Sequence, residues 1–259
     1  MKKLFVRGLS DIDKKQKVGN ELYSGFEELQ TSENSLISYN KFVVTQFIKF
    51  SGYKDLNPDN KSKFKTLDFG AGVGSLALLW SEMSELTVDC FEIDPRQLAI
   101  VRNRGFTGSD KLENIAQDYD FVYTSNVLEH IENDQESLNR LASILKPNGR
   151  IAIYVPAFSV LFSELDRSVG HYRRYGKREL KRKVHASGFR IIRCRYVDSV
   201  GFFASIVIKI LGWKGIGNIG GDKSLVFYDR FIFPISQILD VITFGKVLGK
   251  NLILIAEKS

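Results

Sequence analysis

The sequence predicts an α/β protein built on a doubly wound parallel sheet, and three observations support this fold class. Strand-like and helix-like segments alternate between residues 64 and 197 at the spacing of parallel α/β units. The segment Phe64–Ser75 joins a short apolar strand to a helix through a glycine-rich turn. With 259 residues, 44% of them hydrophobic, the chain is long enough to bury one large core.

The glycine-rich turn contains Gly70, Gly72 and Gly74, and it directly follows the strand that carries Asp68. Glycine allows positive φ angles and leaves room for a ligand against the backbone. The carboxyl edge of a parallel sheet is also where such folds bind ligands. The G-x-G-x-G spacing differs from the G-x-G-x-x-G of dinucleotide sites, which disfavours an NAD-dependent dehydrogenase. A loop that only connects strand and helix is the alternative.

The first half of the chain is expected to alternate helices and strands. Apolar residues at helical spacing predict a helix from Ser32 to about Gly52. Asp94-Pro95 is typical of a helix start, because aspartate caps the first turn and proline fits its first position. The other elements expected here are strands over 64–68, 86–93, 105–107 and 120–124 and helices over 76–83 and 133–145.

The second half changes in character after the strand expected over residues 150–155. Residues 156–175 combine aromatic and cationic side chains, and 199–250 hold two apolar helical stretches around a glycine-rich loop. A helix over 177–186 and strands over 189–197 and 251–256 are also expected. We therefore predict a single domain, and its parts are 32–52, 64–155, 156–198, 199–250 and 251–256.

The net charge of +7 is concentrated in residues 166–195, where eleven Lys and Arg stand against two acids. That stretch carries +9, which leaves −2 for the remainder. Such a region attracts anionic partners, among them nucleic acid and an anionic membrane surface. A solvated helix face is the alternative for Lys177–Lys183.

The two cysteines, Cys90 and Cys194, both lie in apolar strand-like segments. A disulfide, a zinc site and the cysteine cluster of a radical iron–sulfur enzyme are therefore disfavoured, and we expect no metal. We expect a cytoplasmic location in a reducing compartment. Residues 1–7 lack the apolar core of a signal peptide, and no segment reaches the roughly 20 apolar residues of a membrane span.

Four segments resemble the motifs of class I S-adenosylmethionine-dependent methyltransferases: Leu67–Gly74, Phe91–Pro95, Asn126–Ile131 and Leu145–Ile153. The resemblance covers roughly residues 36–257. It implies a Rossmann-like seven-stranded sheet whose last strand, 251–256, is antiparallel, with an apolar helical insertion before it. It also implies S-adenosyl-L-methionine as methyl donor and S-adenosyl-L-homocysteine as product. Tyr39-Asn40, Val155–Ala157 and Gly170–Tyr175 are similar to a bacterial subfamily often encoded near glycosyltransferases.

The resemblance implies a set of cofactor-binding residues. Glu92, 18 residues after Gly74, is expected to accept both ribose hydroxyls. Asp68 would face the ammonium group of the methionine part, and Ser109 and Asp110 the adenine. The full expected set is Tyr39, Asp68, Gly70, Ala71, Gly72, Glu92, Ile93, Ser109, Asp110, Asn126 and Val127. Loop capping and turn formation are the alternatives for the later members.

His171 is the preferred general base among the three histidines. His185 is expected on the surface of a basic helix, and His130 is expected to shape a loop. Residues 156–175 are expected to form the acceptor wall. The side chains expected to contact the acceptor are Asp166, Tyr172, Arg173, Arg174 and Tyr175.

The sequence thus predicts methyl transfer to a small-molecule, glycan or lipid-linked acceptor. A nucleic-acid methyltransferase that uses residues 166–195 is one alternative, although no separate RNA-binding module is visible. A non-catalytic partner subunit that retains the cofactor site is another. The insertion 199–250 is expected to be a lid, a dimer interface or a peripheral membrane contact, or to be buried against the core.

Overall fold

The computed structural model describes residues 33–212, 221–243 and 245–259 of the chain. Within these residues the strands form one seven-stranded sheet of order β3-β2-β1-β4-β5-β7-β6. Its strands are β1 (Thr66–Phe69), β2 (Asp89–Phe91), β3 (Gly108–Ser109), β4 (Tyr119–Ser125), β5 (Leu145–Pro156), β6 (Phe189–Val197) and β7 (Asn251–Lys258). The last strand is antiparallel to both of its neighbours. The Rossmann-like fold expected from the sequence is confirmed.

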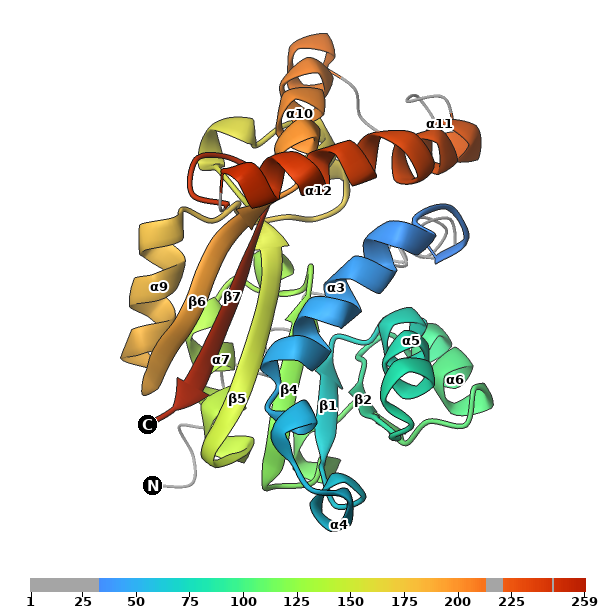
Figure 1. Cartoon of the computed structure of the whole chain (residues 1–259), viewed down its shortest axis with the longest axis vertical. Helices are drawn as coiled ribbons and strands as arrows, with labels where there is room; N and C mark the ends of the chain where they lie inside the picture. The colour runs from blue at the N-terminus through green and yellow to red at the C-terminus, as the bar shows by residue number, and fades with distance from the viewer. Residues whose placement is uncertain (1–32, 213–220, 244) are drawn as a thin grey trace.

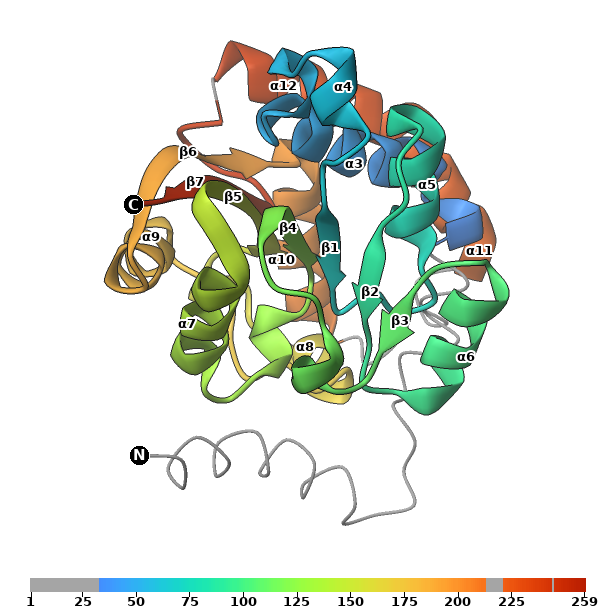
Figure 2. The ribbon, with the colours of Figure 1, turned by 90° about the horizontal axis from the view of Figure 1, so that it is seen from below.

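Helices cover both faces of the sheet (Figures 1 and 2). On one face, α3 (Ile37–Phe50) and α5 (Ser75–Ser84) pack through Phe47 and Trp80 onto Phe121 and Tyr123 of β4. On the other face, α7 (Asp134–Ile144) and α9 (Lys177–Ala186) bury their apolar stripes against β4, β5 and β7. Because the central strands are covered on both sides, nearly all their residues are apolar and buried.

Shorter elements connect these layers. They are α4 (Pro58–Lys61), α6 (Pro95–Asn103), α8 (Glu164–Ser168) and the single turns η1 (Tyr53–Asp55), η2 (Leu112–Asn114), η3 (Leu128–His130) and η4 (Ser159–Leu161). Asp94 caps α6 through its hydrogen bond from the Arg96 amide, with Pro95 at the first helical position, as predicted. Asn133 caps α7 in the same way.

The insertion before β7 forms a helical layer at the carboxyl edge of the parallel strands (Figure 1). It consists of α10 (Ser199–Leu211), α11 (Gly221–Phe227), the π-helical turn η6 (Tyr228–Ile232) and α12 (Phe233–Ile242). Pro156 at the end of β5 pairs with Asn251 at the start of β7, so the segment before Asn251 must lie at that edge. The glycine-rich turn after β1 lies at the same edge, because β1 and β5 run in the same direction.

The larger differences from the sequence-based boundaries are in three strands. The third strand is β3 at Gly108–Ser109, not residues 105–107, because its register is set by pairing of Gly108 with Cys90. β2 is shorter than predicted, with only Asp89–Phe91 in register with β1. β5 begins earlier, at Leu145, which pairs with Tyr119 beyond a register shift. Residues 1–32, for which no element or signal peptide was expected, and most of the loop 212–221 lie outside the described residues.

Candidate active site

The glycine-rich turn adopts the backbone that its composition requires. Gly70, Gly72 and Gly74 all have positive φ angles, of 80°, 58° and 83°. The amides of Gly70 and Ala71 both donate to the carbonyl oxygen of Phe91 at the end of β2. The turn is therefore held against the neighbouring strand, and α5 begins directly after it.

Gly70 also makes room for the turn that follows β4. A Cβ atom at Gly70 would lie 2.3 Å from Cγ2 of Val127, so a side chain there is excluded. Asn126, the residue before Val127, is exposed and has a φ of 54°, uncommon for a residue other than glycine. Strained backbone of this kind is often found at functional sites. The predicted residues of the first and fourth strand ends are thus brought together.

Glu92 links the glycine-rich turn to the start of α6. Its Oε2 accepts a hydrogen bond from the Gly72 amide, and its Oε1 accepts one from the Asp94 amide, both at 2.8 Å. Burial raises the pKa of Glu92, although these two backbone hydrogen bonds oppose the shift. Each oxygen of a carboxylate can accept a further hydrogen bond, so Glu92 retains acceptor capacity beside the turn. Ile93, the next residue, is partly exposed.

Asp68 lies beneath the turn, in the buried strand β1. Its side chain is 2% exposed, and its Oδ2 has no hydrogen-bond partner in the described part of the chain. Burial raises its pKa to about 8. The buried hydroxyl of Tyr123 lies nearby and opposes this rise of the pKa. An unpaired buried carboxyl group is costly, which marks this position as one that a polar ligand group or a water could satisfy.

The other predicted cofactor residues occupy the same edge of the sheet. Ser109 closes a local turn, with hydrogen bonds between its hydroxyl and the backbone of Lys111, and Asp110 is exposed. Tyr39 lies on α3, and its hydroxyl is 2.8 Å from that of Tyr154 and accepts from the Asn251 amide group. For Ser109 and Tyr39, these contacts also explain their positions without a ligand.

His171 is oriented by Asp166. The Oδ1 atom of Asp166 lies 2.8 Å from Nδ1 of His171 and also accepts a hydrogen bond from Nε of Arg174 at 2.7 Å. Burial opposes ionisation of Asp166, but the hydrogen bonds from His171 and the Arg174 guanidinium hold its pKa well below the ordinary value. An ionised carboxylate only accepts, so Nδ1 of His171 carries the hydrogen. Its Nε2 is then the free acceptor.

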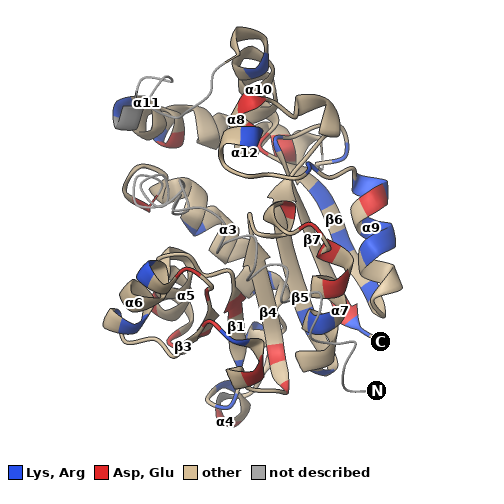
Figure 3. Cartoon of the chain, turned by 180° about the vertical axis from the view of Figure 1, so that it is seen from behind, with Lys and Arg blue, Asp and Glu red and all other residues tan. Residues whose placement is uncertain are grey.

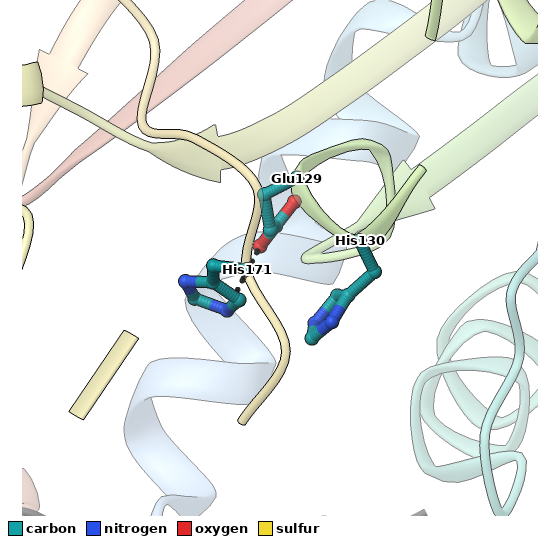
Figure 4. A group of neighbouring side chains, drawn as sticks. All are labelled: Glu129, His130 and His171. Carbon is teal, nitrogen blue, oxygen red and sulfur yellow. Dashed lines mark ion pairs between the residues drawn. The ribbon is translucent and has the colours of Figure 1, made fainter. Parts of the chain in front are cut away.

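His171 also forms a cluster with Glu129 and His130 (Figure 4). The Glu129 side chain is fully buried, and neither of its oxygens has a hydrogen-bond partner among the residues that the structure describes. Its Oε1 lies 4.0 Å from Nε2 of His171, and the two histidine rings are 4.6 Å apart. Burial raises the pKa of Glu129 to about 8, whereas burial and the neighbouring His171 lower that of His130 to about 4. One ligand atom from each of the three residues lies within 4.8 Å of the others, so they could also hold a metal ion.

Most of the predicted acceptor residues around His171 form hydrogen bonds or ion pairs with other residues of the chain. Arg173 binds Asp134 and the Glu132 carbonyl oxygen, while Arg174 is 8% exposed and pairs with Asp166. The hydroxyl of the buried Tyr175 donates to Asp134. Tyr172 is 44% exposed, the most accessible of the set. Asp166, which was also expected to contact the acceptor, is 1% exposed and pairs with Arg174.

Sequence reasoning missed two acids in this region. Glu129 was seen only as part of a loop motif, although it lies one residue before His130. Asp134 was expected only as part of the helix over 133–145, yet it accepts bonds from Arg173, Tyr175 and Lys183. The only sequence signal for these two acids is that several acidic residues follow the fourth strand within a short stretch.

The cations of the basic stretch 166–195 include those of α9 and β6 (Figure 3), and part of them are paired within the fold. Five of its eleven cations are in ion pairs with carboxylates, and these cations are Arg167, Arg173, Arg174, Lys183 and Arg190. Others lie over aromatic rings, as Lys177 does over Tyr196. The local charge of +9 is therefore smaller in the folded protein than the sequence indicates.

A hollow of about 260 Å³ lies away from these residues, between α3, β6 and α12. Its lining includes Phe42, Arg193, Arg195 and Asp240, none of which was predicted to bind a ligand. The candidate site is therefore identified by its chemistry and backbone geometry.

Solved structures of low sequence identity share this fold. A putative sarcosine dimethylglycine methyltransferase from Galdieria sulphuraria matches with a TM-score of 0.57 and 17% identity, over 86% of each chain. Phosphoethanolamine N-methyltransferase 2 from Haemonchus contortus, in complex with S-adenosyl-L-methionine, matches with a TM-score of 0.56 and 17% identity, over 93% of this chain and 61% of that one. Magnesium protoporphyrin IX methyltransferase from Synechocystis PCC 6803, with bound SAH, gives 0.54 and 14%, over 97% and 95%.

A comparison with curated proteins finds no match to this chain. A model of the methyltransferase domain family, however, matches residues 43–193, which is more than half of the 259 residues. The matched range runs from α3 to β6 and includes the glycine-rich turn, Glu92, the cluster around Glu129 and His171. The chain belongs to the methyltransferase domain family.

Proposed function

We propose that this protein transfers a methyl group from S-adenosylmethionine to a small-molecule, glycan or lipid-linked acceptor. The observation that carries the proposal is a continuous set of contacts from the glycine-rich turn to His171. Val127 packs against Gly70, and its carbonyl oxygen accepts from the His130 amide. The Glu129 carbonyl oxygen in turn accepts from the Tyr172 amide at 2.8 Å. The cofactor side and the acceptor side are thus parts of one site.

The residues present fit S-adenosylmethionine. The Glu92 carboxylate has acceptor capacity for two ribose hydroxyls, and the buried Oδ2 of Asp68 lacks a partner. At Gly72 the turn contains no side chain that would keep a ligand from the backbone. S-adenosylmethionine supplies a methyl group on a positively charged sulfur, already activated for in-line displacement. Two of the similar structures contain bound S-adenosylmethionine or SAH, which supports the assignment.

His171 is proposed as the group that takes a proton from the acceptor. Asp166 fixes the tautomer with hydrogen on Nδ1, so Nε2 is available to accept. The ionised carboxylate of Asp166, 2.8 Å from Nδ1, would stabilise the imidazolium that forms. The residues around His171 would align the reactants and exclude water. The largely buried surroundings of the cluster suit this role.

Two alternatives differ in what they predict. A nucleic-acid methyltransferase would need the basic surface of residues 166–195, much of which is paired with carboxylates. A non-catalytic partner subunit would bind the cofactor without transferring its methyl group to any acceptor.

The test has two steps. First, S-adenosylhomocysteine and NAD are titrated into the protein by calorimetry, and we expect binding of the former only. Second, the protein is incubated with methyl-labelled S-adenosylmethionine and separate lipid, glycan, small-molecule and nuclease-sensitive fractions of a bacterial extract. We expect label in one of the first three fractions and none with the His171→Ala variant. Nuclease-sensitive label, or binding without transfer to any fraction, would contradict the proposal in favour of one of the alternatives.

A further inference from the structure

The insertion that holds α10, η6 and α12 has its apolar side chains on the outside. In α10 the buried residues are Ser199, Gly201 and Ser205. The exposed residues of this helix include large apolar ones, each more than half exposed: Phe203, Val207, Ile210 and Leu211. A helix that packs on a protein core normally shows the reverse arrangement.

The second long helix of the insertion repeats the pattern. The buried residues of α12 are Phe233, Ser236 and Asp240, whereas Ile235, Ile238, Val241 and Ile242 are each more than half exposed. Among the described residues, twenty large apolar side chains are exposed, and thirteen of them lie in the insertion. In addition to those of α10 and α12 already named, these are Val226, Phe227, Phe231, Leu239 and Val247.

Polar contacts, together with a few buried apolar side chains such as Phe233 against Tyr39, attach this layer to the domain. Asp229 accepts hydrogen bonds from the amides of Ser38 and Tyr39 in the first turn of α3, both at 2.8 Å. Asp240 accepts from the amides of Asp198 and Ser199 at the start of α10. The exposed apolar side chains are therefore not needed to hold the insertion in place.

The charges of the insertion are sorted by sign. Among its described side chains the acids are Asp229 and Asp240, and both are buried. The exposed charged side chains are all cationic: Lys209, Lys223, Arg230 and Lys246. Among the side chains that the structure describes, the outer surface of the insertion thus combines apolar and cationic groups without an exposed acid.

We propose that this surface docks onto a bilayer that contains anionic lipids. Exposed apolar side chains with cations around them match the boundary between acyl chains and anionic headgroups. No described helix is long and apolar enough to cross a membrane, so the contact is with one surface. A second copy of the chain is a poorer partner, because a two-fold interface would bring the four described cations of each copy together, and no described acid of the layer is exposed to pair with them.

The experiment is flotation of the full chain with vesicles of phosphatidylcholine alone or with phosphatidylglycerol added. We expect binding to the mixed vesicles and at least tenfold weaker partitioning onto phosphatidylcholine alone. The double variant Ile210→Asp, Ile238→Asp should lose binding to the mixed vesicles by at least tenfold. Met83→Asp, at a residue of α5 that is also partly exposed, is the matched control and should bind like the parent. Unchanged circular dichroism shows that each variant is folded.

Three results would overturn the proposal. The first is a parent protein that stays monomeric and does not float with mixed vesicles at low salt. The second is salt-sensitive binding that the double variant retains, because the basic surface of α9 would then be the contact. The third is a dimer, measured by sedimentation equilibrium, that the double variant dissociates while vesicles leave the parent unbound. Docking does not depend on the proposed methyl transfer and is measured without cofactor.

Discussion

The Oε1 atom of Glu129 lies 4.0 Å from Nε2 of His171, while neither Glu129 oxygen has a hydrogen-bond partner in the described structure. A fully buried carboxyl group in this position remains protonated to a much higher pH than an exposed one. The same group faces the nitrogen that we propose as proton acceptor. Its ionisation is therefore tied both to the stability of the fold and to the chemistry of the site.

Glu129→Gln should change how stability depends on pH. Burial raises the pKa of Glu129 to about 8 from an ordinary value of 4.5, so between these values the folded protein keeps a proton that the unfolded chain releases. Stability of the parent must then fall as pH rises through this window, by at most on the order of 1 kcal/mol per pH unit from this group. We expect the Tm of Glu129→Gln, relative to the parent, to rise between about pH 5 and pH 8. The exposed Glu113→Gln variant is the control, and an equal difference at all pH values would show that a cation neutralises Glu129.

Asp166→Asn and His171→Ala should both lower turnover by about 10²–10⁴-fold, measured as S-adenosylhomocysteine release. The amide of the asparagine can donate to Nδ1 and so favour the wrong imidazole tautomer, which removes the acceptor at Nε2. Affinity for S-adenosylhomocysteine should remain within about twofold. His185→Ala, on the exposed side of α9, should behave like the parent.

A chelator distinguishes whether the cluster of Glu129, His130 and His171 supplies a general base or binds a metal ion. If His171 acts as a base, EDTA should leave the turnover of the parent unchanged. Loss of turnover with EDTA and its recovery with a divalent cation would instead assign Glu129, His130 and His171 to a metal site.

Glu92→Ala should weaken S-adenosylhomocysteine binding by about 1.5–3 kcal/mol, because charge-assisted hydrogen bonds to the ribose are lost. It should also lower stability, since the amides of Gly72 and Asp94 lose their acceptor. Asp94→Ala removes a helix cap and the pair with Arg96, so it should cost about 1 kcal/mol of stability and leave binding nearly unchanged. Calorimetry and thermal unfolding measure the two effects. Parental affinity in Glu92→Ala would remove Glu92 from the cofactor site.

Arg174→Ala should destabilise the protein more than Arg173→Ala does. Arg174 is buried beside Asp166, and removal of one partner of a buried ion pair costs about 3–5 kcal/mol. Arg173 is more exposed, and Asp134 keeps its partners Lys183 and Tyr175 when Arg173 is removed. Denaturant unfolding of both variants provides the comparison. Equal losses would mean that the Asp166–Arg174 contact is not maintained in solution.

The features that the sequence determined by itself are those set by neighbouring residues. The strand, glycine turn and helix around Gly70 to Gly74 follow from backbone freedom at three positions. The caps at Asp94 and Asn133 follow from side chains that reach the next turn. The position of β3 was nevertheless predicted wrongly. A strand of two residues has no hydrophobic pattern of its own, and its position is set by pairing with β2.

The tertiary structure alone decided which distant residues meet. Asp229 caps α3 from 190 residues away in the chain, and Asp166 selects Arg174 rather than its neighbour Arg173. Periodicity shows which residues of α10 share a face, but it does not show whether that face is turned toward the core or toward solvent. Here polar caps hold the helix on its small-residue side, so the apolar side is left outside. The unpaired burial of Glu129 has the same origin, since burial depends on elements that the local sequence does not contain.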